Sequence, residues 1–442
     1  MYKRRAAGAL ALGLATAITV VGCSSSDSPN SNPSGDGNTA NGEPVTITFW
    51  SWPEGTDKTV EEFNATHDDV QVKYTNAGGG DESAAKLLTA VRSGEAPDVS
   101  LVEYTTLPSL IVGGAVMDIT DKVGDIQDAF SPGAWEQTTF DGVVYGVPQD
   151  VGPAAMVYNA KAFADAGITE PPATWDDFRK DAELIKAHDP KAVIGAYPPS
   201  ELGFFASAAA LTGSKWWSYE GDAWSVNIGD QATQDMATFF QGMADDGLIS
   251  TDSLLTADYN AKLNANQMLS WTSALWATGV VQGVADDSQM GNWRLARFPQ
   301  WEAGKTAVGY QGGSAAIVTA SSEKVDAAME FITWLNATAE GNQAFLTNSG
   351  AYPAATVGQE LTTSLPTPPI AEGQDDYYKL AADIASDTIG VSWGPNVAYA
   401  KTVLEEELGK AIQNHTSWAD AFVATGEAVK KDLKDQGYNV AN

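Results

Sequence analysis

Strand and helix patterns alternate near the start of the folded part of this 442-residue sequence, and this alternation limits the fold more than any other feature. The strand segments are rich in β-branched and aromatic residues, and the segments between them carry helical apolar spacing. Strand–helix–strand order is typical of a parallel sheet with right-handed crossovers, and therefore of an α/β fold. The expected strands are 45–50, 70–74 and 98–102, and the expected helices are 57–65 and 81–93.

The ends of these strands are the first place to look for a binding site. In open sheets of this kind ligands lie beyond the carboxyl ends of the strands, so residues 50–54 and 103–104 are candidates. The length of the chain suits two lobes of ordinary size rather than one small domain.

Further along the chain, two helices have clear start signals. Thr174 and Asp177 form a capping-box pattern before one apolar stripe, and Ser321–Ser322 precede another at 325–335. The Pro-rich segment 365–370 is predicted to be a surface loop between helices.

The N-terminus has the layout of a secretory signal. Lys3, Arg4 and Arg5 precede seventeen uncharged residues, 6–22, and then the single cysteine, Cys23. A slightly short membrane anchor with an incidental cysteine is the alternative interpretation.

The segment Val20–Cys23 resembles the bacterial lipobox. That resemblance implies a lipoprotein signal peptide at 1–22, cleaved before Cys23, and a diacylglyceryl thioether on the Cys23 sulfur. Lipid chains on this cysteine would hold the protein to a membrane. Sixteen of the 21 residues at 24–44 are Ser, Asn, Pro or Gly, so residues 23–44 are predicted to be a lipidated cysteine and a flexible linker. Folded structure should begin near Val45.

Charge and composition exclude several classes of function. The chain has 25 Lys and Arg against 57 Asp and Glu, a formal net charge of −32, which removal of Lys3, Arg4 and Arg5 changes to −35. Nucleic-acid binding depends on cationic side chains, so no nucleic-acid partner is expected. With three His and one Cys we expect no zinc site of the Cys/His type, no disulfide framework and no cofactor.

Several short motifs, each weak singly, follow one another along most of the chain. They are 96–98 (APD), 141–148 (DGVVYGVP), 156–159 (MVYN), 172–175 (PATW), 268–276, 312–314 and 352–353. With these motifs the sequence resembles the extracellular solute-binding proteins, family 1 (maltose-binding-protein-like), of bacterial ABC sugar importers. The resemblance implies a binding protein that is not an enzyme.

The resemblance also implies an architecture. It is the two-lobed periplasmic-binding-protein fold of type II, with a mixed, mainly parallel sheet flanked by helices in each lobe and a hinge beside the cleft. We expect lobe 1 at 45–155, completed by 301–350, and lobe 2 at 156–300, completed by 351–442.

A function and a location follow from the same resemblance. The protein would capture a carbohydrate, expected to be an oligosaccharide, between the lobes and deliver it to the permease subunits of an ABC transporter. It would act as a monomer on the extracellular face of a bacterial membrane, Gram-positive or actinobacterial, held by the lipid on Cys23.

Aromatic rings beside carboxylates suit carbohydrate recognition, because a flat ring covers the apolar face of a sugar while carboxylates and amides bind its hydroxyls. The resemblance assigns Trp52, Glu54, Glu103, Tyr104, Trp276 and Trp393 to the cleft. Trp217 lies in a Gly/Ser-flanked segment, predicted to be a loop, and Asp150 follows an apolar segment. Gly312, Gly313 and Ser314 resemble the family loop whose backbone approaches the ligand.

Each candidate also has a plainer interpretation. Glu103 could be a solvated loop acid, the glycines at 312–313 a turn leading into a strand, and a Trp at a strand end a core residue. Trp50 is expected to be in the core, as are three tryptophans on helical stripes, Trp175, Trp334 and Trp418.

Three other functions stay open from the sequence. An extracellular glycoside hydrolase needs only a suitably spaced carboxylate pair, which 57 acidic residues cannot exclude. A binding protein for a non-sugar polar solute would use the same fold, and a surface adhesin is the third alternative.

Overall fold

The computed structural model describes residues 43–349 and 351–441. The predicted signal peptide, the predicted lipidation site Cys23 and most of the predicted linker lie outside the described residues. The first strand starts at Val45, as expected. Within the described part of the chain, no helix has the length and apolar character needed to cross a membrane.

The predicted strand–helix alternation is confirmed. The strands β1 (Val45–Ser51), β2 (Val70–Asn76) and β3 (Val99–Glu103) enclose the helices α1 (Thr56–Thr66) and α2 (Gly80–Ser93). β1 pairs in parallel with both β2 and β3, so the three strands end at one edge of the sheet.

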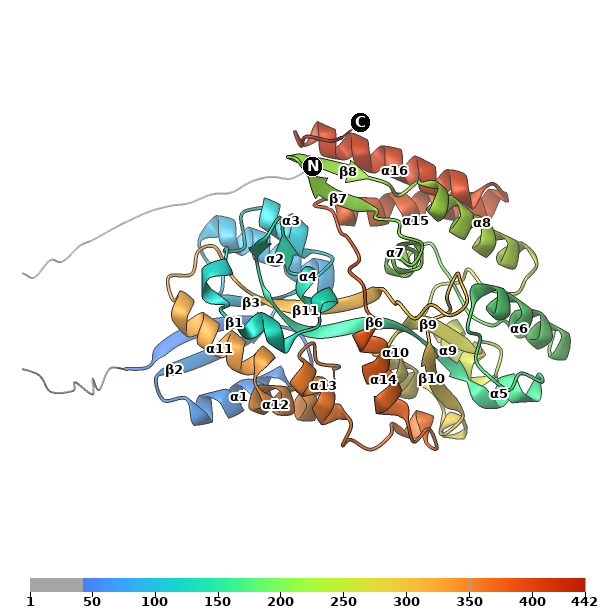
Figure 1. Cartoon of the computed structure of the whole chain (residues 1–442), viewed down its shortest axis with the longest axis horizontal. Helices are drawn as coiled ribbons and strands as arrows, with labels where there is room; N and C mark the ends of the chain where they lie inside the picture. Colours follow the sequence, from blue (N-terminus) through green and yellow to red (C-terminus); the bar gives the residue numbers. More distant parts are fainter. Residues whose placement is uncertain (1–42, 350, 442) are drawn as a thin grey trace, which may run out of the picture. The chain divides into compact units, whose positions relative to one another are not determined.

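The strand β6 connects the two halves of a seven-stranded sheet. The strand order is β10-β6-β11-β3-β1-β2, and β9 also pairs with β6. The first part of β6 (Val147–Asn159) pairs with β11 (Tyr310–Val318), which in turn pairs with β3. The second part of β6 pairs with β9 (Ser270–Ala274) and β10 (Trp293–Arg297). Figure 1 shows β6 and β11 side by side through the centre of the molecule.

The expectation of a mixed, mainly parallel sheet is confirmed in both halves. In the first half, only β11 runs against β1, β2, β3 and β6. In the second half, β9 and β10 are both antiparallel to β6 and therefore run parallel to each other, and the isolated bridges of Val193 with Met268 and of Ala196 with Ser250 are parallel as well. The strand that runs against the others there is β6, which arrives directly from the first half, whereas the chain passes from β9 to β10 through the helix α10.

The other helices and short strands cover the two halves of this sheet. Between β3 and β6 lie α3 (Leu107–Val112), α4 (Pro132–Glu136), β4 (Thr139–Phe140) and β5 (Val143–Val144). Between β6 and β11 lie α5 (Ala160–Asp165), α6 (Trp175–His188), α7 (Leu202–Ala210), β7 (Trp217–Glu220), β8 (Ala223–Val226), α8 (Gln231–Asp245), α9 (Ala257–Asn264) and α10 (Ala277–Val284). After β11 come α11 (Val325–Ala337), α12 (Ala339–Ser349), α13 (Thr356–Thr362), α14 (Tyr377–Ser386), α15 (Val397–Asn414) and α16 (Trp418–Asp435).

Of the two helix-start signals in the sequence, one forms a side-chain cap and the other does not. Thr174 Oγ1 accepts a hydrogen bond from the Asp177 backbone N–H at 3.1 Å, so the predicted cap of α6 is confirmed. α11 instead starts after Lys324 without a side-chain cap. The hydroxyl of Ser322 donates to Asp98 Oδ1 at 2.9 Å, which ties this loop to the start of β3.

The Pro-rich segment 365–370 is only partly a surface loop. It leads into a 3₁₀ turn, Pro369–Ala371, in which Ile370 is fully buried. An apolar side chain in a loop is drawn into the core when neighbouring helices leave it space.

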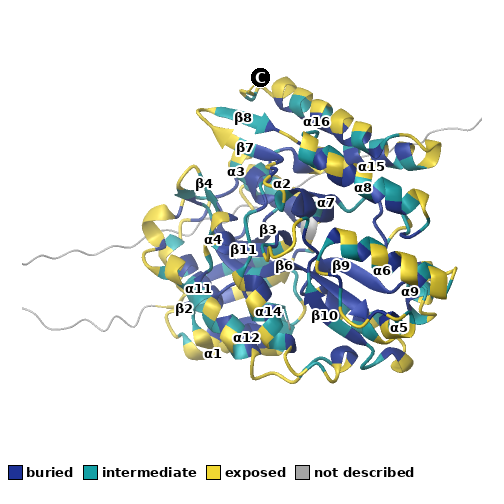
Figure 2. Cartoon of the chain, turned by 45° about the vertical axis from the view of Figure 1, so that its right-hand side comes forward, coloured by how far each residue is buried: buried dark blue, intermediate teal, exposed yellow. Residues whose placement is uncertain are grey.

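Aromatic packing builds much of the core. Trp175 lies among Phe178, Phe204, Phe240 and Phe298 with ring centroids 5.1–6.0 Å apart. Figure 2 shows the central strands buried and the outer faces of the helices exposed.

Of the four tryptophans predicted to be core residues, two are buried and two are only partly buried. Trp175 and Trp418 are buried, while Trp50 and Trp334 are half-buried against the core.

Candidate functional site

Three candidate residues meet in one row across the sheet. Ser314 of β11 lies opposite Glu103 of β3 on one side and opposite Asp150 of β6 on the other. Residues opposite one another in neighbouring strands have their side chains on the same face. The Ser314 hydroxyl donates to Asp150 Oδ1 at 2.7 Å, and the Thr105 hydroxyl donates to Glu103 Oε2 at 3.3 Å. We call Glu103, Ser314 and Asp150 the polar row.

The environment of the polar row favours the neutral form of one carboxyl. Burial raises the pKa of Asp150 from its ordinary value of 3.8 to about 6, and the negative charge of Glu103 adds to this effect. Hydrogen bonds from Ser314 oppose the shift. The row therefore combines acceptor oxygens with a carboxyl that changes charge near neutral pH.

Two glycines shape the strand beside the polar row. Gly312 and Gly313 have φ angles of 82° and 102°, which favour glycine, and they lie inside β11 where its pairing with β6 is irregular. A Cβ on Gly313 would lie 2.7 Å from Tyr104 Cε2, so the close approach also requires glycine. The alternative of a turn leading into the strand is wrong, because the strand starts before these residues, at Tyr310.

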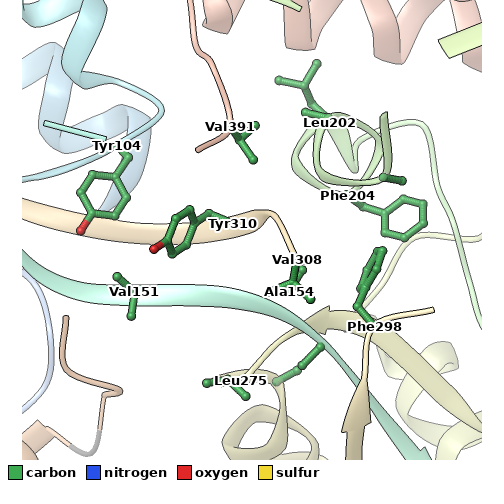
Figure 3. Packing of buried hydrophobic residues seen from close by; sticks show 14 of the residues in the cluster. Tyr104, Val151, Ala154, Leu202, Phe204, Leu275, Phe298, Val308, Tyr310 and Val391 are labelled. Carbon is green, nitrogen blue, oxygen red and sulfur yellow. The ribbon is translucent and has the colours of Figure 1, made fainter. Parts of the chain in front are cut away.

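Tyr104 packs against the irregular part of β11 from inside the protein. Its side chain is buried, its hydroxyl donates to the Asp150 backbone oxygen at 2.9 Å, and burial raises its pKa. Figure 3 shows Tyr104, Tyr310 and Val151 gathered along β11 and β6. The structure thus gives Tyr104 a packing position rather than an open surface.

Trp276 presents the most accessible indole among the candidates. It precedes α10 and is 37% exposed, yet its ring is held in place. The indole N–H donates to the Gln311 backbone oxygen at 2.8 Å, and the ring packs edge-on against Trp271. A fixed ring with exposed surface is what stacking on a sugar needs.

The sequence missed two polar residues beside Trp276. Gln311 is 8% exposed, and its Nε2 donates to Glu201 Oε2 at 3.0 Å. Burial raises the pKa of Glu201, which precedes α7 without capping it. Gln311 Oε1 has no hydrogen-bond partner among the described residues. Glu201 and Gln311 are 110 positions apart, so no local pattern links them.

Trp52 and Glu54 follow β1 at the same edge of the sheet. Because Trp50 pairs with Ser100, the chain leaves β1 close to where Glu103 ends β3. Trp52 is half-buried against Gly79, and Glu54 is exposed in the turn before α1. Both residues therefore lie just beyond the edge of the sheet at which Glu103 ends β3.

Trp217 and Trp393 lie elsewhere. They line a pocket of about 670 Å³ that none of the other candidate residues lines. Their exposed fractions are 0% and 6%, and their ring centroids are 6.3 Å apart. The predicted loop at Trp217 is wrong, because this residue starts β7.

One tyrosine lies between the polar row and this pocket. The ring of Tyr310 is 6.4 Å from that of Tyr104, and its hydroxyl is 2.8 Å from the Thr388 hydroxyl. The charge of Glu136, a pocket residue, contributes to the raised pKa of Tyr310, after the larger effect of burial. Tyr310 thus connects Tyr104, beside the polar row, with the wall of the pocket that holds Trp217 and Trp393.

No cluster of three or more His, Cys, Asp or Glu suited to a metal ion occurs in the described part of the chain.

A sequence model of bacterial extracellular solute-binding proteins matches residues 50–342. The chain belongs to this family. The family consists of non-catalytic solute-binding proteins, so the prediction of a binding protein that is not an enzyme is confirmed.

Solved structures show the same fold. The galacto-N-biose-/lacto-N-biose I-binding protein of an ABC transporter from Bifidobacterium longum, solved with lacto-N-biose, is 28% identical. The similarity covers 91% of this chain and 100% of that one, with a TM-score of 0.79. The periplasmic-binding-protein fold is therefore confirmed.

Two relatives from Streptomyces match over shorter stretches. The diacetylchitobiose binding protein of Streptomyces coelicolor is 28% identical over 254 residues, which are 56% of this chain and 58% of the relative. An uncharacterized lipoprotein of Streptomyces antibioticus is 35% identical over 153 residues, 32% of this chain and 34% of the relative.

Proposed function

We propose that this solute-binding protein captures a carbohydrate, of oligosaccharide size, and delivers it to the permease subunits of an ABC transporter. The observation that carries the proposal is the fixed, exposed ring of Trp276 beside polar acceptors. The indole would cover the apolar face of a sugar ring. Glu201, Gln311 and the polar row would accept its hydroxyl hydrogens. The sugars named for the relatives from Bifidobacterium longum and Streptomyces coelicolor support this ligand class.

Capture would involve closure of two lobes, 45–155 with 301–350 and 156–300 with 351–442. The proposed boundary at 155–156 falls within β6, after Asp150 of the polar row and inside the segment 154–158 that pairs with β9. A sugar shifts the lobes toward closure only if it binds the closed form better than the open one.

The proposal is tested by thermal unfolding of the purified protein against monosaccharides, disaccharides and oligosaccharides. A ligand present at one hundred times its Kd adds about 2.7 kcal/mol to the free energy of unfolding. Sugars of the class that binds should therefore raise the thermal unfolding midpoint, and other sugars should not. If polyols or other polar solutes raise the midpoint and no sugar does, the ligand is not a carbohydrate.

The site is tested by Trp276→Ala. Loss of the stacking surface should weaken binding of the selected sugar at least about tenfold, or about 1.4 kcal/mol, in calorimetric titration. Tyr399→Ala is the matched control, because Tyr399 is an exposed aromatic residue on α15. Equal affinities of the native protein and Trp276→Ala would remove the indole from the site.

We also propose that Cys23 carries the lipid that holds the protein at the extracellular face of the membrane. The lipobox-like segment at 20–23 and the similarity to a Streptomyces lipoprotein support this. Cys23→Ser should move the protein from the membrane fraction to the soluble fraction, since the thioether cannot form. Continued retention in the membrane fraction would show that the apolar segment 6–22 is itself the anchor.

A further inference from the structure

The two neighbouring glycines of β11 lie between two residues that the rest of the protein holds in place. Ser314 follows them and belongs to the polar row, where it is bonded to Asp150 and paired with Glu103. Gln311 precedes them and is held by residues of the segment between β6 and β11. The glycine pair is therefore the short stretch of β11 across which the two proposed lobes can turn relative to each other.

The backbone around the glycine pair is suited to bending. The pairing of β11 with β6 is irregular here, so that Gln311 and Gly312 together face Gly152 alone. A bulge of this kind bends a strand and increases its twist. Gly312 and Gly313 have positive φ angles, and glycine changes its backbone angles at little steric cost. A few residues that absorb changes of φ and ψ are what a hinge between lobes needs.

Three hydrogen bonds hold the end of β11 that precedes the glycines. The indole N–H of Trp276 donates to the Gln311 backbone oxygen at 2.8 Å, and Gln311 Nε2 donates to Glu201 Oε2 at 3.0 Å. The Ser207 hydroxyl, on α7, donates to the Tyr310 backbone oxygen at 2.6 Å. Figure 3 shows Tyr310 at this end of β11. The partners Trp276, Glu201 and Ser207 all belong to the proposed second lobe, so this end of β11 should move with it.

Glu201 is placed in an unusual way for a residue at the start of a helix. It occupies the N-cap position of α7, yet its side chain accepts no hydrogen bond from that helix. A carboxylate near the first turn of a helix is normally stabilised by the free N–H groups there. Glu201 instead reaches Gln311, 110 positions further along the chain. The carboxylate is thus used to hold Gln311 rather than to cap its own helix.

Gln311 is consequently bonded at two of its atoms. Glu201 holds its side-chain amide, and its backbone oxygen accepts the hydrogen bond that fixes the Trp276 indole. A Cβ on Gly152 would lie 2.2 Å from the same backbone oxygen, so β6 touches Gln311 from the other side. The orientation of the Trp276 ring therefore depends on the position of Gln311, which the Glu201 side chain helps to set.

From these contacts we propose that Glu201 is a positioning residue for ligand capture. Through Gln311 it holds the Trp276 indole in place and fixes one end of the Gly312–Gly313 hinge. The inference rests on the proposed function, in which the Trp276 ring stacks on a sugar. It acts in the sugar-free protein, so it is separate from any hydrogen bond between Glu201 and the ligand.

The test is NMR of the indole N–H groups in the sugar-free full chain. The signal of Trp276 is identified by its loss in Trp276→Phe. Glu201→Ala should shift this signal and speed exchange of its proton with water about fivefold, because the bond to Gln311 loosens. Glu201→Gln keeps a side-chain oxygen for Gln311 and should restore the native signal. Glu405→Ala is the matched control, because Glu405 is exposed on α15.

A second variant checks that Glu201 acts through Gln311. Gln311→Met removes the same contact from its other end and should change the Trp276 signal in the same way, even if Glu201→Ala alone does not fold. The double variant should show no larger change than either single one, because both remove one contact. An unchanged Trp276 signal in Glu201→Ala and Gln311→Met, or effects that add in the double variant, would overturn the proposal.

The outcome is distinguishable from failure of the proposed function. If no sugar raises the thermal midpoint but both variants shift the Trp276 signal, the carbohydrate function is refuted and the positioning of the ring by Glu201 stands. If a sugar binds and neither variant alters the Trp276 signal, the positioning proposal alone is refuted. If both hold, Glu201→Ala should also weaken binding of that sugar severalfold, with recovery in Glu201→Gln.

Discussion

Replacing Asp150 by Asn should change how the stability of the protein depends on pH. Burial raises the pKa of Asp150 to about 6 in the folded protein, against an ordinary value of 3.8. One pKa unit corresponds to about 1.4 kcal/mol, so folding disfavours the charged form by up to about 3 kcal/mol. Asn carries no charge, and the Ser314 hydroxyl can still donate to its amide oxygen.

The direction of the effect follows from the raised pKa. Because the folded protein holds the proton more tightly than the unfolded chain, the penalty is fully present above the folded pKa and disappears as the pH falls toward 4. The free energy of unfolding of Asp150→Asn, relative to the native protein, should therefore increase by up to about 3 kcal/mol between pH 4 and pH 8.

Urea unfolding followed by tryptophan fluorescence across this pH range is the assay, with Asp98→Asn as the control of opposite sign. Burial raises the pKa of Asp98, but bonds from Thr48 and Ser322 and the charge of Lys324 outweigh it and lower the pKa. The ionised Asp98 stabilises the fold at neutral pH, and this contribution is lost as the pH falls through its lowered pKa. A difference between Asp150→Asn and the native protein that does not vary with pH would refute the reasoning.

Two further predictions concern stability. Gly313→Ala should cost about 2–4 kcal/mol, because a side chain at this φ is strained and its Cβ would meet Tyr104. Gly114→Ala, which has a positive φ but open space around it, should cost only about 1–2 kcal/mol, and equal losses of thermal midpoint would exclude the contact with Tyr104 as a cause. Thr174→Ala should cost about 1 kcal/mol through loss of the α6 cap, and Thr174→Ser should restore most of it. Chemical unfolding that leaves Thr174→Ala as stable as the native protein would contradict the capping role.

Local patterns predicted the first half of the fold well. The strands at 45–51, 70–76 and 99–103 and the helix after Thr174 differ from expectation by a few residues at most, because apolar periodicity and capping act over short stretches. Pairing direction in the second half was not predictable in this way. It depends on β6 meeting strands more than one hundred positions away, β9 and β10.

The candidate site was predicted in part for the same reason. Glu103 and Asp150 drew attention as acids after apolar segments, but only the register of β11 shows that Ser314 joins them. Glu201 and Gln311 carry no local signal, since their contact forms only in the folded chain. Trp217 was misassigned because its Gly/Ser neighbours suggested a loop, whereas its ring is fully buried.

The position of β11 in the sheet has a consequence for the order in which the chain can fold. β3 ends at Glu103, yet its partner β11 begins only at Tyr310. While the chain emerges from a ribosome or a secretion channel, β3 and the first part of β6 therefore remain open edges until residue 318 has appeared. Exposed strand edges invite pairing with other chains, and contacts between distant residues form slowly. The interval before β11 arrives is therefore the stage of synthesis at which this chain is most open to pairing with other chains.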